Sequence, residues 1–186
     1  MRIISGSLKG RSIDFIKNST TRPLKDVVKE NIFNILKHSK LINVKIENSH
    51  ILDLYSGIGS FGIECVSRGA SKVVFVEKNK NSSNILKKKI TKFSIEEKTK
   101  VLNEKIENVL NIFDNKDFDI FFLDPPFADK DFIKILNLIK NKKIFNSDHI
   151  VIIHRDVRTN DNLKNYLSEI MIKKYGRSKI IFGVFN

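Results

Sequence analysis

Three acidic side chains stand within or at the end of short apolar runs, and they are the first residues in this sequence that could do chemistry. Asp53 lies in the run ILDLY, Glu77 ends KVVFVE and Asp124 ends DIFFLD. Continuous apolar runs of this length are typical of buried strands in a parallel sheet. Because such sheets bind ligands at the carboxyl ends of their strands, we expect the three carboxylates to line one site.

A glycine-rich segment follows the first of these acids. Gly57, Gly59 and Gly62 have the spacing G-x-G-x-x-G, and the helix-like residues Ile63–Ser67 come next. Strand, glycine turn and helix form the pattern of a nucleotide-type cofactor site, because glycine permits a sharp turn and a close ligand. A turn that only packs a helix onto a sheet is the alternative, but it leaves the acids unexplained.

Asp53 decides between two classes of cofactor. The glycine spacing alone favours NAD or FAD, whose pyrophosphate binds at a helix N-terminus. A carboxylate beside that position repels phosphate, but it suits S-adenosylmethionine, which carries an α-ammonium and a sulfonium. Glu77 lies about twenty residues after Gly57, the spacing expected for a ribose-hydroxyl acceptor with either cofactor. We therefore predict S-adenosylmethionine.

The segment Asp124-Pro125-Pro126-Phe127 is the second motif with chemical content. Two prolines fix a stiff turn without backbone donors, and its carbonyls are expected to point outward, unpaired. Asp124 and the Pro125 carbonyl can each accept one N–H of an exocyclic amino group, while Phe127 stacks on the base for about 1–3 kcal/mol. This arrangement turns the nitrogen lone pair toward a methyl donor. An ordinary loop after a strand is the alternative.

Composition bounds the class of protein. The chain has 186 residues, 41% of them hydrophobic and 30% charged, which indicates one globular domain. No run approaches the roughly eighteen apolar residues of a membrane helix, and no secretory signal or cluster of metal ligands is visible. A single cysteine excludes an internal disulfide framework. We expect a cytoplasmic enzyme.

The net charge of +13 and the pI near 9.8 indicate a polyanionic partner. The excess of Lys, Ile, Asn and Phe also fits AT-rich coding DNA, so the positions of the arginines are more informative than the total charge. The candidate RNA-binding residues are Arg2, Lys9, Arg11, Arg22 and Arg177. For the N-terminal ones two interpretations remain open, an RNA-contacting flap or an edge hairpin guarded by basic residues.

Hydrophobic periodicity predicts an α/β fold, a doubly wound parallel sheet with an antiparallel end. An N-terminal hairpin of strands 2–5 and 11–15 precedes a helix whose apolar stripe is Val27, Val28, Ile32, Phe33, Ile35 and Leu36. The further predicted strands are 51–55, 72–77, 101–103, 119–124, 149–154, 170–175 and 179–185. The further predicted helices are 63–67, 80–93, 106–113, 132–139 and 163–167.

With ILDLYSGIGSFGIECVSRGA, VFVEKN and FLDPPF in this order, the chain resembles class I S-adenosylmethionine-dependent methyltransferases that act on amino groups. The segments RIISGSLKGRSI, TRPLKDVVKENIFNIL and KKYGRSKIIFGVF make it similar to the bacterial RsmD family. That family comprises guanine-N2 methyltransferases of 16S ribosomal RNA, of the guanine-966 type. The resemblance covers nearly the whole chain.

The resemblance implies a Rossmann-like, seven-stranded methyltransferase domain over residues 21–186, with an antiparallel terminal strand. An N-terminal β-hairpin extension would occupy residues 1–20. The implied partner is 16S rRNA within the assembled small ribosomal subunit, bound by a monomer. No membrane partner is expected.

The resemblance also implies site residues. Those for the cofactor are Asp53, Tyr55, Gly57, Gly59, Glu77, Lys78, Ile106 and Asp124, and those for catalysis are Asp124, Pro125, Pro126 and Phe127. One departure concerns the adenine. Lys105 stands where such enzymes usually have Asp or Asn, which leaves Asn103 or the Ile106 amide for that contact.

Other functions fit part of the pattern. A DNA adenine-N6 methyltransferase can use the same Asp-Pro-Pro-aromatic turn, but it usually needs a separate sequence-reading domain, for which this chain has no spare length. A glutamine-methylating enzyme favours Asn in place of Asp124. A non-catalytic nucleic-acid-binding protein on a methyltransferase fold is the alternative from another class, and the intact acids argue against it.

Overall fold

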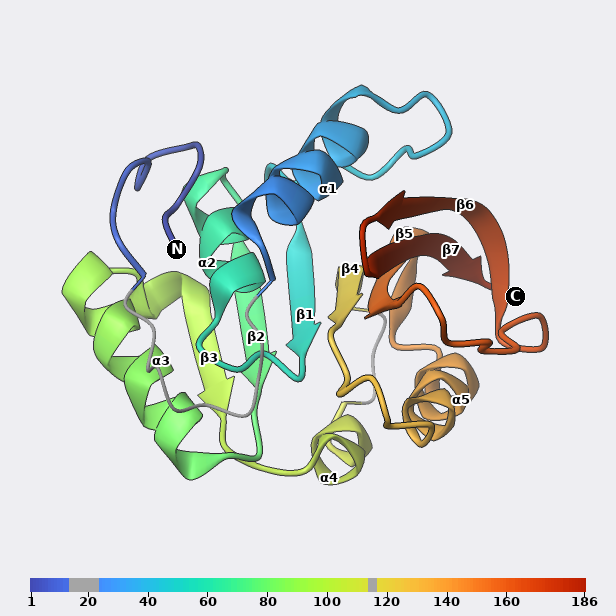
Figure 1. The fold of residues 1–186 in the computed structure, drawn as a ribbon. Coiled ribbons are helices and arrows are strands. Elements are labelled where there is room, and N and C mark those ends of the chain that lie inside the picture. Colours follow the sequence, from blue (N-terminus) through green and yellow to red (C-terminus); the bar gives the residue numbers. More distant parts are fainter. Residues whose placement is uncertain (14–23, 114–116) are drawn as a thin grey trace.

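The fold is built on one mixed sheet of seven strands with helices on both faces (Figure 1). The computed structural model describes residues 1–13, 24–113 and 117–186. The strands are β1 His50–Leu54, β2 Lys72–Val76, β3 Thr99–Leu102, β4 Phe118–Leu123, β5 Phe145–Asp156, β6 Leu167–Tyr175 and β7 Ser178–Phe185. The helices are α1 Asp26–His38, α2 Ser60–Ser67, α3 Lys80–Phe93, α4 Ile106–Asn111 and α5 Phe132–Lys142, with a short 3-10 helix at Glu96–Lys98.

The strand order β3-β2-β1-β4-β5-β7-β6 confirms the predicted fold class. Strands β1 to β5 pair in parallel, while β7 runs antiparallel between β5 and β6. From β1 the chain first builds the sheet in one direction, to β2 and β3, and then continues on the other side of β1 with β4 and β5. The direction of strand addition therefore reverses beside β1. In an open α/β sheet this switch point is where ligands bind, outside the carboxyl ends of the strands.

Each strand contributes alternate side chains to two separate cores. Helices α1, α2 and α3 cover one face, where Phe33, Phe61 and Phe122 form a continuous stack with ring centroids 5.2 and 4.0 Å apart. Helices α4 and α5 cover the other face over Leu52 and Leu54. Both faces of the central strands are therefore buried, as their unbroken apolar runs predict.

Most predicted elements form, but the helix predicted at residues 163–167 and the place of Val27 in the apolar stripe are wrong. Residues 163–167 were predicted as a helix; they make a single turn, closed by the Leu167 amide on the Leu163 carbonyl, and then enter β6. Pairing of Leu167 with Phe185 across the sheet takes the place of further helical bonds. Val27, assigned to the apolar stripe of α1, is 65% exposed, whereas its neighbour Val28 is buried.

The N-terminal segment pairs with itself as a hairpin over its described residues. One antiparallel bridge joins Arg2 with Ser12, and three backbone hydrogen bonds of 2.9–3.0 Å link the two arms: Ile3 amide to Arg11 carbonyl, Gly10 amide to Ile3 carbonyl and Ile13 amide to Met1 carbonyl. Residues 14 and 15 of the predicted second strand lie outside the described part. Ile3 and Ile13 are nevertheless buried in the core on the α1–α3 side. The boundary predicted after residue 20 also falls outside the described residues, so the division into extension and domain stays a prediction.

A buried carboxylate on α2 anchors this segment. Glu64 is fully buried and accepts the amides of Ile4 and Ser5 at 2.8 and 2.9 Å, together with Nε of Arg68 at 2.8 Å. The Lys29 ammonium on α1 lies 3.6 Å from Glu64 and donates to the Arg2 carbonyl at 2.8 Å. Glu64 therefore joins three parts of the chain that are far apart in sequence.

Lys29 depends on these partners because it is itself fully buried. Burial lowers the pKa of its ammonium, while the carboxylates of Glu64 and Asp26 raise it. A buried charge pair of this kind is costly to break, because removal of one partner leaves the other charge uncompensated.

We predict that Glu64→Ala destabilises the protein by about 3–5 kcal/mol, because it leaves Lys29 without its closest buried counter-charge and two backbone amides without acceptors. Urea unfolding followed by circular dichroism measures the loss. The matched variant Glu64→Gln keeps an oxygen acceptor and should lose less. Amide exchange at Ile4 and Ser5 should accelerate in Glu64→Ala; unchanged exchange there contradicts the anchoring role.

Candidate active site

The three acidic residues singled out in the sequence meet at the carboxyl edge of the sheet. Asp53 is the fourth residue of β1, Glu77 directly follows β2, and Asp124 directly follows β4. Strands β2 and β4 flank β1 on either side, with Asp53 in register with Phe75 and Phe122. The carboxylates of Asp124 and Glu77 both raise the pKa of Asp53. The structure therefore brings these acids into one electrostatic site.

Asp53 is the most deeply placed of them, with 1% of its surface exposed. One carboxylate oxygen, Oδ2, accepts the Gly62 amide at 3.0 Å, while Oδ1 has no partner among the described residues. Burial is the main cause that raises the pKa of Asp53 well above its usual value, and the Gly62 amide partly opposes it. A buried acceptor without a donor fits a cationic group such as an α-ammonium.

The glycine turn between β1 and α2 is shaped by close packing and held by Glu77. Gly59 has φ +80°, and a Cβ there would lie 2.4 Å from the Leu86 side chain. A Cβ at Gly62 would lie 2.3 Å from the Phe75 ring. The Gly57 amide donates to Oε2 of Glu77 at 2.8 Å, so the second acid fixes the turn that follows the first.

The Glu77 carboxylate also organises the start of α3, because its Oε1 accepts the Asn79 amide at 2.6 Å. Each oxygen keeps a second lone pair, which can accept a ribose hydroxyl as the sequence predicts. Lys78, the next predicted cofactor residue, is exposed, and its carbonyl accepts Nδ2 of Asn103 at 3.2 Å. The same Nδ2 donates to the Glu77 carbonyl at 2.8 Å.

These bonds bear on the adenine contact. Asn103 uses its amide hydrogens to join the ends of β2 and β3, so only its side-chain oxygen is left to accept an adenine amino group. Lys105 is the residue before α4 and makes no side-chain cap there. Ile106 is buried at the first position of α4, where a backbone amide has no partner within the helix.

Tyr55 joins the cofactor side of the site to the Asp-Pro-Pro-Phe turn. Its φ of +58° is a left-handed conformation that is unusual for a residue with a large side chain. Burial raises the pKa of its hydroxyl above the usual value, and so does the Asp129 carboxylate just after the turn. Backbone strain of this kind is often found at functional sites.

The Asp-Pro-Pro-Phe turn lies at the carboxyl edge, as predicted, but not all of its backbone carbonyls are unpaired. The Pro126 carbonyl accepts the Asp129 amide at 2.8 Å and Nη1 of Arg155 at 3.0 Å, and the Phe127 carbonyl accepts Nη2 of Arg155 at 3.2 Å. The expectation of unpaired carbonyls is wrong for these two. The Pro125 carbonyl has no donor among the described residues, but the residue is buried, and its role as an acceptor for the amine stays a prediction.

Arg155 is a site residue that the sequence analysis missed. Its guanidinium is 1% exposed, makes two bonds of 3.1 Å to the Asp161 carboxylate, and lies 4.4 Å from the centre of the Phe132 ring. A planar guanidinium suits this role because its donors have a fixed geometry. An arginine at the end of a buried strand is a weak signal, since its partners come from two distant segments.

His154 was also missed, although the sequence analysis placed it at the end of a strand. Its Nδ1 lies 2.8 Å from Oδ1 of Asp124, and its ring meets the Phe127 ring edge to face with centroids 5.5 Å apart. The histidine therefore contacts the two side chains of the turn that were expected to hold a base.

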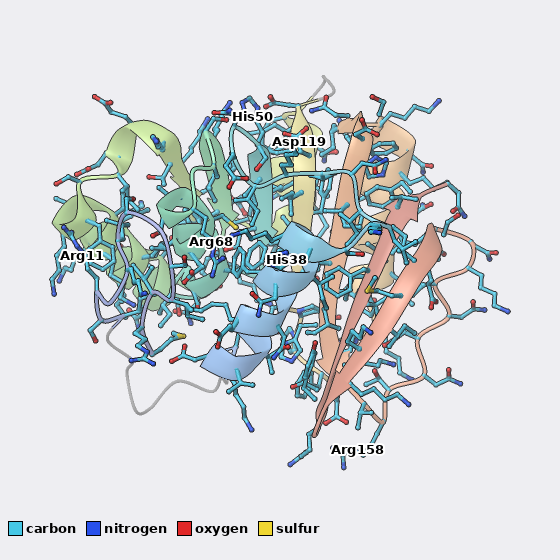
Figure 2. All side chains as sticks on the ribbon, turned by 90° about the horizontal axis from the view of Figure 1, so that it is seen from above. Arg11, His38, His50, Arg68, Asp119 and Arg158 are labelled. Atoms are coloured by element: carbon cyan, nitrogen blue, oxygen red, sulfur yellow. The ribbon has the colours of Figure 1, made fainter. Side chains whose placement is uncertain are left out.

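A hollow of about 410 Å³ opens beside Phe127. Its lining residues are Phe127, Ala128, Asp156, Arg158, Thr159 and Arg177. Hydrogen bonds from Arg158 and the charge of Arg177 lower the pKa of Asp156 far below its usual value. Figure 2 shows Arg158 at the opposite end of the strands from His50 and Asp119, which places it at the carboxyl edge with the acids.

The predicted RNA-binding residues divide into two groups. Arg177 lies at the hollow, whereas Arg2, Lys9 and Arg11 are exposed on the N-terminal segment. Arg11 lies 5.5 Å from the centre of the Phe93 ring of α3, on another flank from Arg158 (Figure 2). Arg22 lies outside the described residues.

The described residues offer neither a metal site nor a membrane-spanning helix. Among them, no group of three or more His, Cys, Asp or Glu side chains could hold a metal ion. No helix in the described ranges is long and apolar enough to cross a membrane.

Comparison with known proteins gives a consistent result. The family model described as conserved hypothetical protein 95 matches residues 1–184. The putative rRNA methyltransferase YlbH of Bacillus subtilis is 31% identical over 158 residues, which is 84% of this chain and 83% of the relative. The ribosomal RNA small subunit methyltransferase D of Buchnera aphidicola (subsp. Acyrthosiphon pisum) is 34% identical over 154 residues, or 83% of this chain and 77% of the relative.

Solved structures share the fold. The putative methyltransferase yhhF from Escherichia coli superposes with a TM-score of 0.82 at 24% identity, over 100% of this chain and 98% of that one. An RNA methyltransferase from Salinibacter ruber, solved with S-adenosyl-L-homocysteine, gives a TM-score of 0.64 at 11% identity over 87% and 92% of the two chains.

We predict that Asp53→Asn weakens S-adenosylmethionine binding by about 10–100-fold, because it removes a buried charged acceptor worth about 1.5–3 kcal/mol. The raised pKa of Asp53 gives a second signature. Bound ammonium favours the ionised carboxyl, so binding should release protons and strengthen as the pH rises through that raised pKa.

Titration calorimetry over a series of pH values, in two buffers with different ionisation enthalpies at each pH, measures both the affinity and the released protons. In Asp53→Asn the proton release should vanish and the affinity should no longer change with pH. Equal proton release by the variant and the unchanged protein would place the ammonium elsewhere.

Proposed function

This chain belongs to the RsmD family, whose model is described as conserved hypothetical protein 95, and on that premise we propose its reaction. It is an S-adenosylmethionine-dependent rRNA methyltransferase that methylates the exocyclic N2 of a guanine in 16S rRNA, at the position-966 type of site. The observation that carries the proposal is the meeting of a buried, half-paired Asp53 with the Asp-Pro-Pro-Phe turn at one sheet edge. It acts as a monomer on the assembled small subunit.

The cofactor assignment is supported by the chemistry of the donor set. S-adenosylmethionine supplies an electrophilic methyl group on a sulfonium. Asp53 offers a buried acceptor for the ammonium, and Glu77 holds the glycine turn while it keeps lone pairs for the ribose. An edge where the carboxylates of Asp124 and Glu77 raise the pKa of a third, that of Asp53, would repel a pyrophosphate but stabilises two positive charges.

The amino-group substrate is supported by the acceptors beside that edge. Oδ1 of Asp124 is taken by His154, which leaves Oδ2 and the Pro125 carbonyl to accept the two hydrogens of an exocyclic amine. The nitrogen is a poor nucleophile because its lone pair is delocalised into the ring. Asp124 stabilises the positive charge that develops on nitrogen, and then takes the proton that this nitrogen loses.

The place of the base is supported by Phe127 and the hollow beside it. Phe127 is one of the residues that line the hollow, and a volume of about 410 Å³ is large enough for a nucleotide that has left its stack. Arg158 and Arg177 on the rim can contact the flanking phosphates, since both are mostly exposed. Single-stranded or loop bases are the usual targets of proteins that read RNA this way.

The names of the relatives support an rRNA substrate and the small subunit. Guanine N2 and the position-966 type of site come from the family resemblance together with the two acceptors of the turn. An adenine N6 group would satisfy the same acceptors, so the identity of the methylated nucleoside is the decisive measurement.

We predict that Asp124→Ala lowers the methyl-transfer rate by about 10²–10⁴-fold, because it removes the group that stabilises and deprotonates the amine. S-adenosylmethionine affinity should change far less, since Asp53 and Glu77 remain. Transfer of tritiated methyl groups to small subunits from a strain that lacks the gene measures the rate, and calorimetry measures the affinity.

Nucleoside analysis of the methylated RNA tests the substrate in the same experiment. N2-methylguanosine in 16S rRNA is the expected product. N6-methyladenosine, whether in RNA or in added DNA, contradicts the guanine assignment, and equal rates for Asp124→Ala and the unchanged protein contradict the role of Asp124.

We predict that Arg158→Ala and Arg177→Ala each weaken binding to the small subunit and reduce the slope of log K against log salt by about 0.7–0.9, because each removes one phosphate contact. Filter binding over a range of potassium concentrations measures the slope. The control Lys37→Ala removes the same charge from the exposed end of α1 and should leave the slope unchanged. Equal slopes for all three variants contradict a phosphate contact at the hollow.

A further inference from the structure

A row of polar side chains crosses three neighbouring strands at the carboxyl edge of the sheet. Ile150 and Ile152 of β5 face the core on the α1–α3 side, so the alternation of the strand puts His154 on that face too. In the same way Phe122 of β4 lies on this face two residues before Asp124. In β7, which runs antiparallel to β5, Ile180 lies on this face two residues after Ser178. At the carboxyl edge, therefore, the apolar face ends in a row of three polar side chains, Asp124, His154 and Ser178.

The row is a continuous chain of hydrogen bonds. His154 Nδ1 lies 2.8 Å from Oδ1 of Asp124, and Nε2 lies 2.9 Å from Oγ of Ser178. A carboxylate oxygen can only accept, so Nδ1 carries the hydrogen and donates it to Asp124. The Asp124 carboxylate therefore sets the tautomer, and Nε2 is left to accept the Ser178 hydroxyl, which can donate as well as accept.

Burial makes this contact different from a surface ion pair. The His154 side chain is 8% exposed, whereas that of Asp124 is 23% exposed. The buried histidine thus holds Oδ1 of Asp124 and leaves Oδ2 for a ligand. Its ring also meets Phe127 edge to face, so the aromatic arm of the turn rests on the same imidazole.

Other charged groups near this end of β5 have partners of their own. Arg155 is bound to Asp161 and to the carbonyls of the turn, and it belongs to the face of α5. Arg158 and Arg177 pair with Asp156, and Lys179 pairs with Asp161. Among the described residues, Asp124 is the charged group that forms a hydrogen bond with His154.

We propose that His154 is a positioning residue for methyl transfer: its Nδ1–H holds the Asp124 carboxylate in the orientation that accepts the amine, and its ring supports Phe127. The proposal rests on the proposed function, because it assigns Asp124 the amine. It adds a residue that acts through Asp124 and touches neither the cofactor nor the base. Ser178 is the outer member of the chain, and its hydroxyl is the partner of Nε2.

Replacing His154 by asparagine or by glutamine distinguishes the role of Nδ1 from that of Nε2. The side-chain nitrogen of asparagine stands where Nδ1 stands, so His154→Asn keeps a donor for Asp124 but cannot reach Ser178. The nitrogen of the longer glutamine stands near Nε2, so His154→Gln reaches Ser178 but loses the bond to Asp124. Both variants remove the aromatic ring, and therefore both lose the contact with Phe127 equally.

The measurement is the single-turnover methyl-transfer rate on small subunits at saturating S-adenosylmethionine, with cofactor affinity and melting temperature measured alongside. We expect His154→Asn to be about 10–100-fold faster than His154→Gln, the range given by one hydrogen bond to a charged group. Cofactor affinity and melting temperature should differ little between the two variants. Equal rates of the two variants overturn the proposal.

A nuclear magnetic resonance arm keeps this test distinct from that of the proposed function. In the unchanged protein the imidazole nitrogen shifts should show the Nδ1–H form, and Asp124→Ala should change them. An Nε2–H form overturns the proposal whatever the activity. If the unchanged protein methylates no guanine in small subunits, the proposed function fails, and these shifts alone decide whether His154 holds Asp124.

Discussion

The hydrogen bond between Oδ2 of Asp53 and the Gly62 amide is the constraint on which the site depends. It ties the central strand to the first turn of α2 across the glycine turn, and the packing at Gly59 and Gly62 leaves no room for side chains there. The same bond consumes only one carboxylate oxygen. The second oxygen is thereby fixed, buried and unpaired, which is costly for the protein alone and favourable once a cation is bound.

The sheet divides the proposed reaction between its two halves. β1, β2 and β3 carry the glycine turn, Glu77 and Asn103, and the N-terminal segment is fastened to α2 on this side by Glu64. β4, β5 and β7 carry the Asp-Pro-Pro-Phe turn and the side chains that brace it. The halves join where the Asp124 amide meets the Leu54 carbonyl at 3.4 Å, so the proposed methyl donor and acceptor sites are linked through adjacent strands.

The sequence sufficed for the parts of the site that are local. Strand, glycine turn and helix follow from a few adjacent residues, and acids at strand ends must share an edge once the sheet is parallel. The side chains that brace the turn could not be found in that way. Arg155 and His154 make their contacts with residues 6 to 30 positions away, and an isolated histidine or arginine in the sequence gives no sign of them. The helix predicted at residues 163–167 failed for a related reason, because sheet pairing with Phe185 outweighed local helical preference.

The protein is strongly basic overall, but the candidate site is acidic. A chain with a net charge of +13 places three carboxylates, those of Asp53, Glu77 and Asp124, at the carboxyl edge, while Arg158 and Arg177 line the hollow. Asp156 holds Arg158 and Arg177 beside the hollow, so these cations are oriented before any anion arrives. On the proposed function, a phosphate backbone would be attracted to the rim of this hollow and repelled by the carboxylates of the sheet edge. The neutral base of a nucleotide would meet no such repulsion, so the arrangement that holds the backbone outside would admit the base to Asp124.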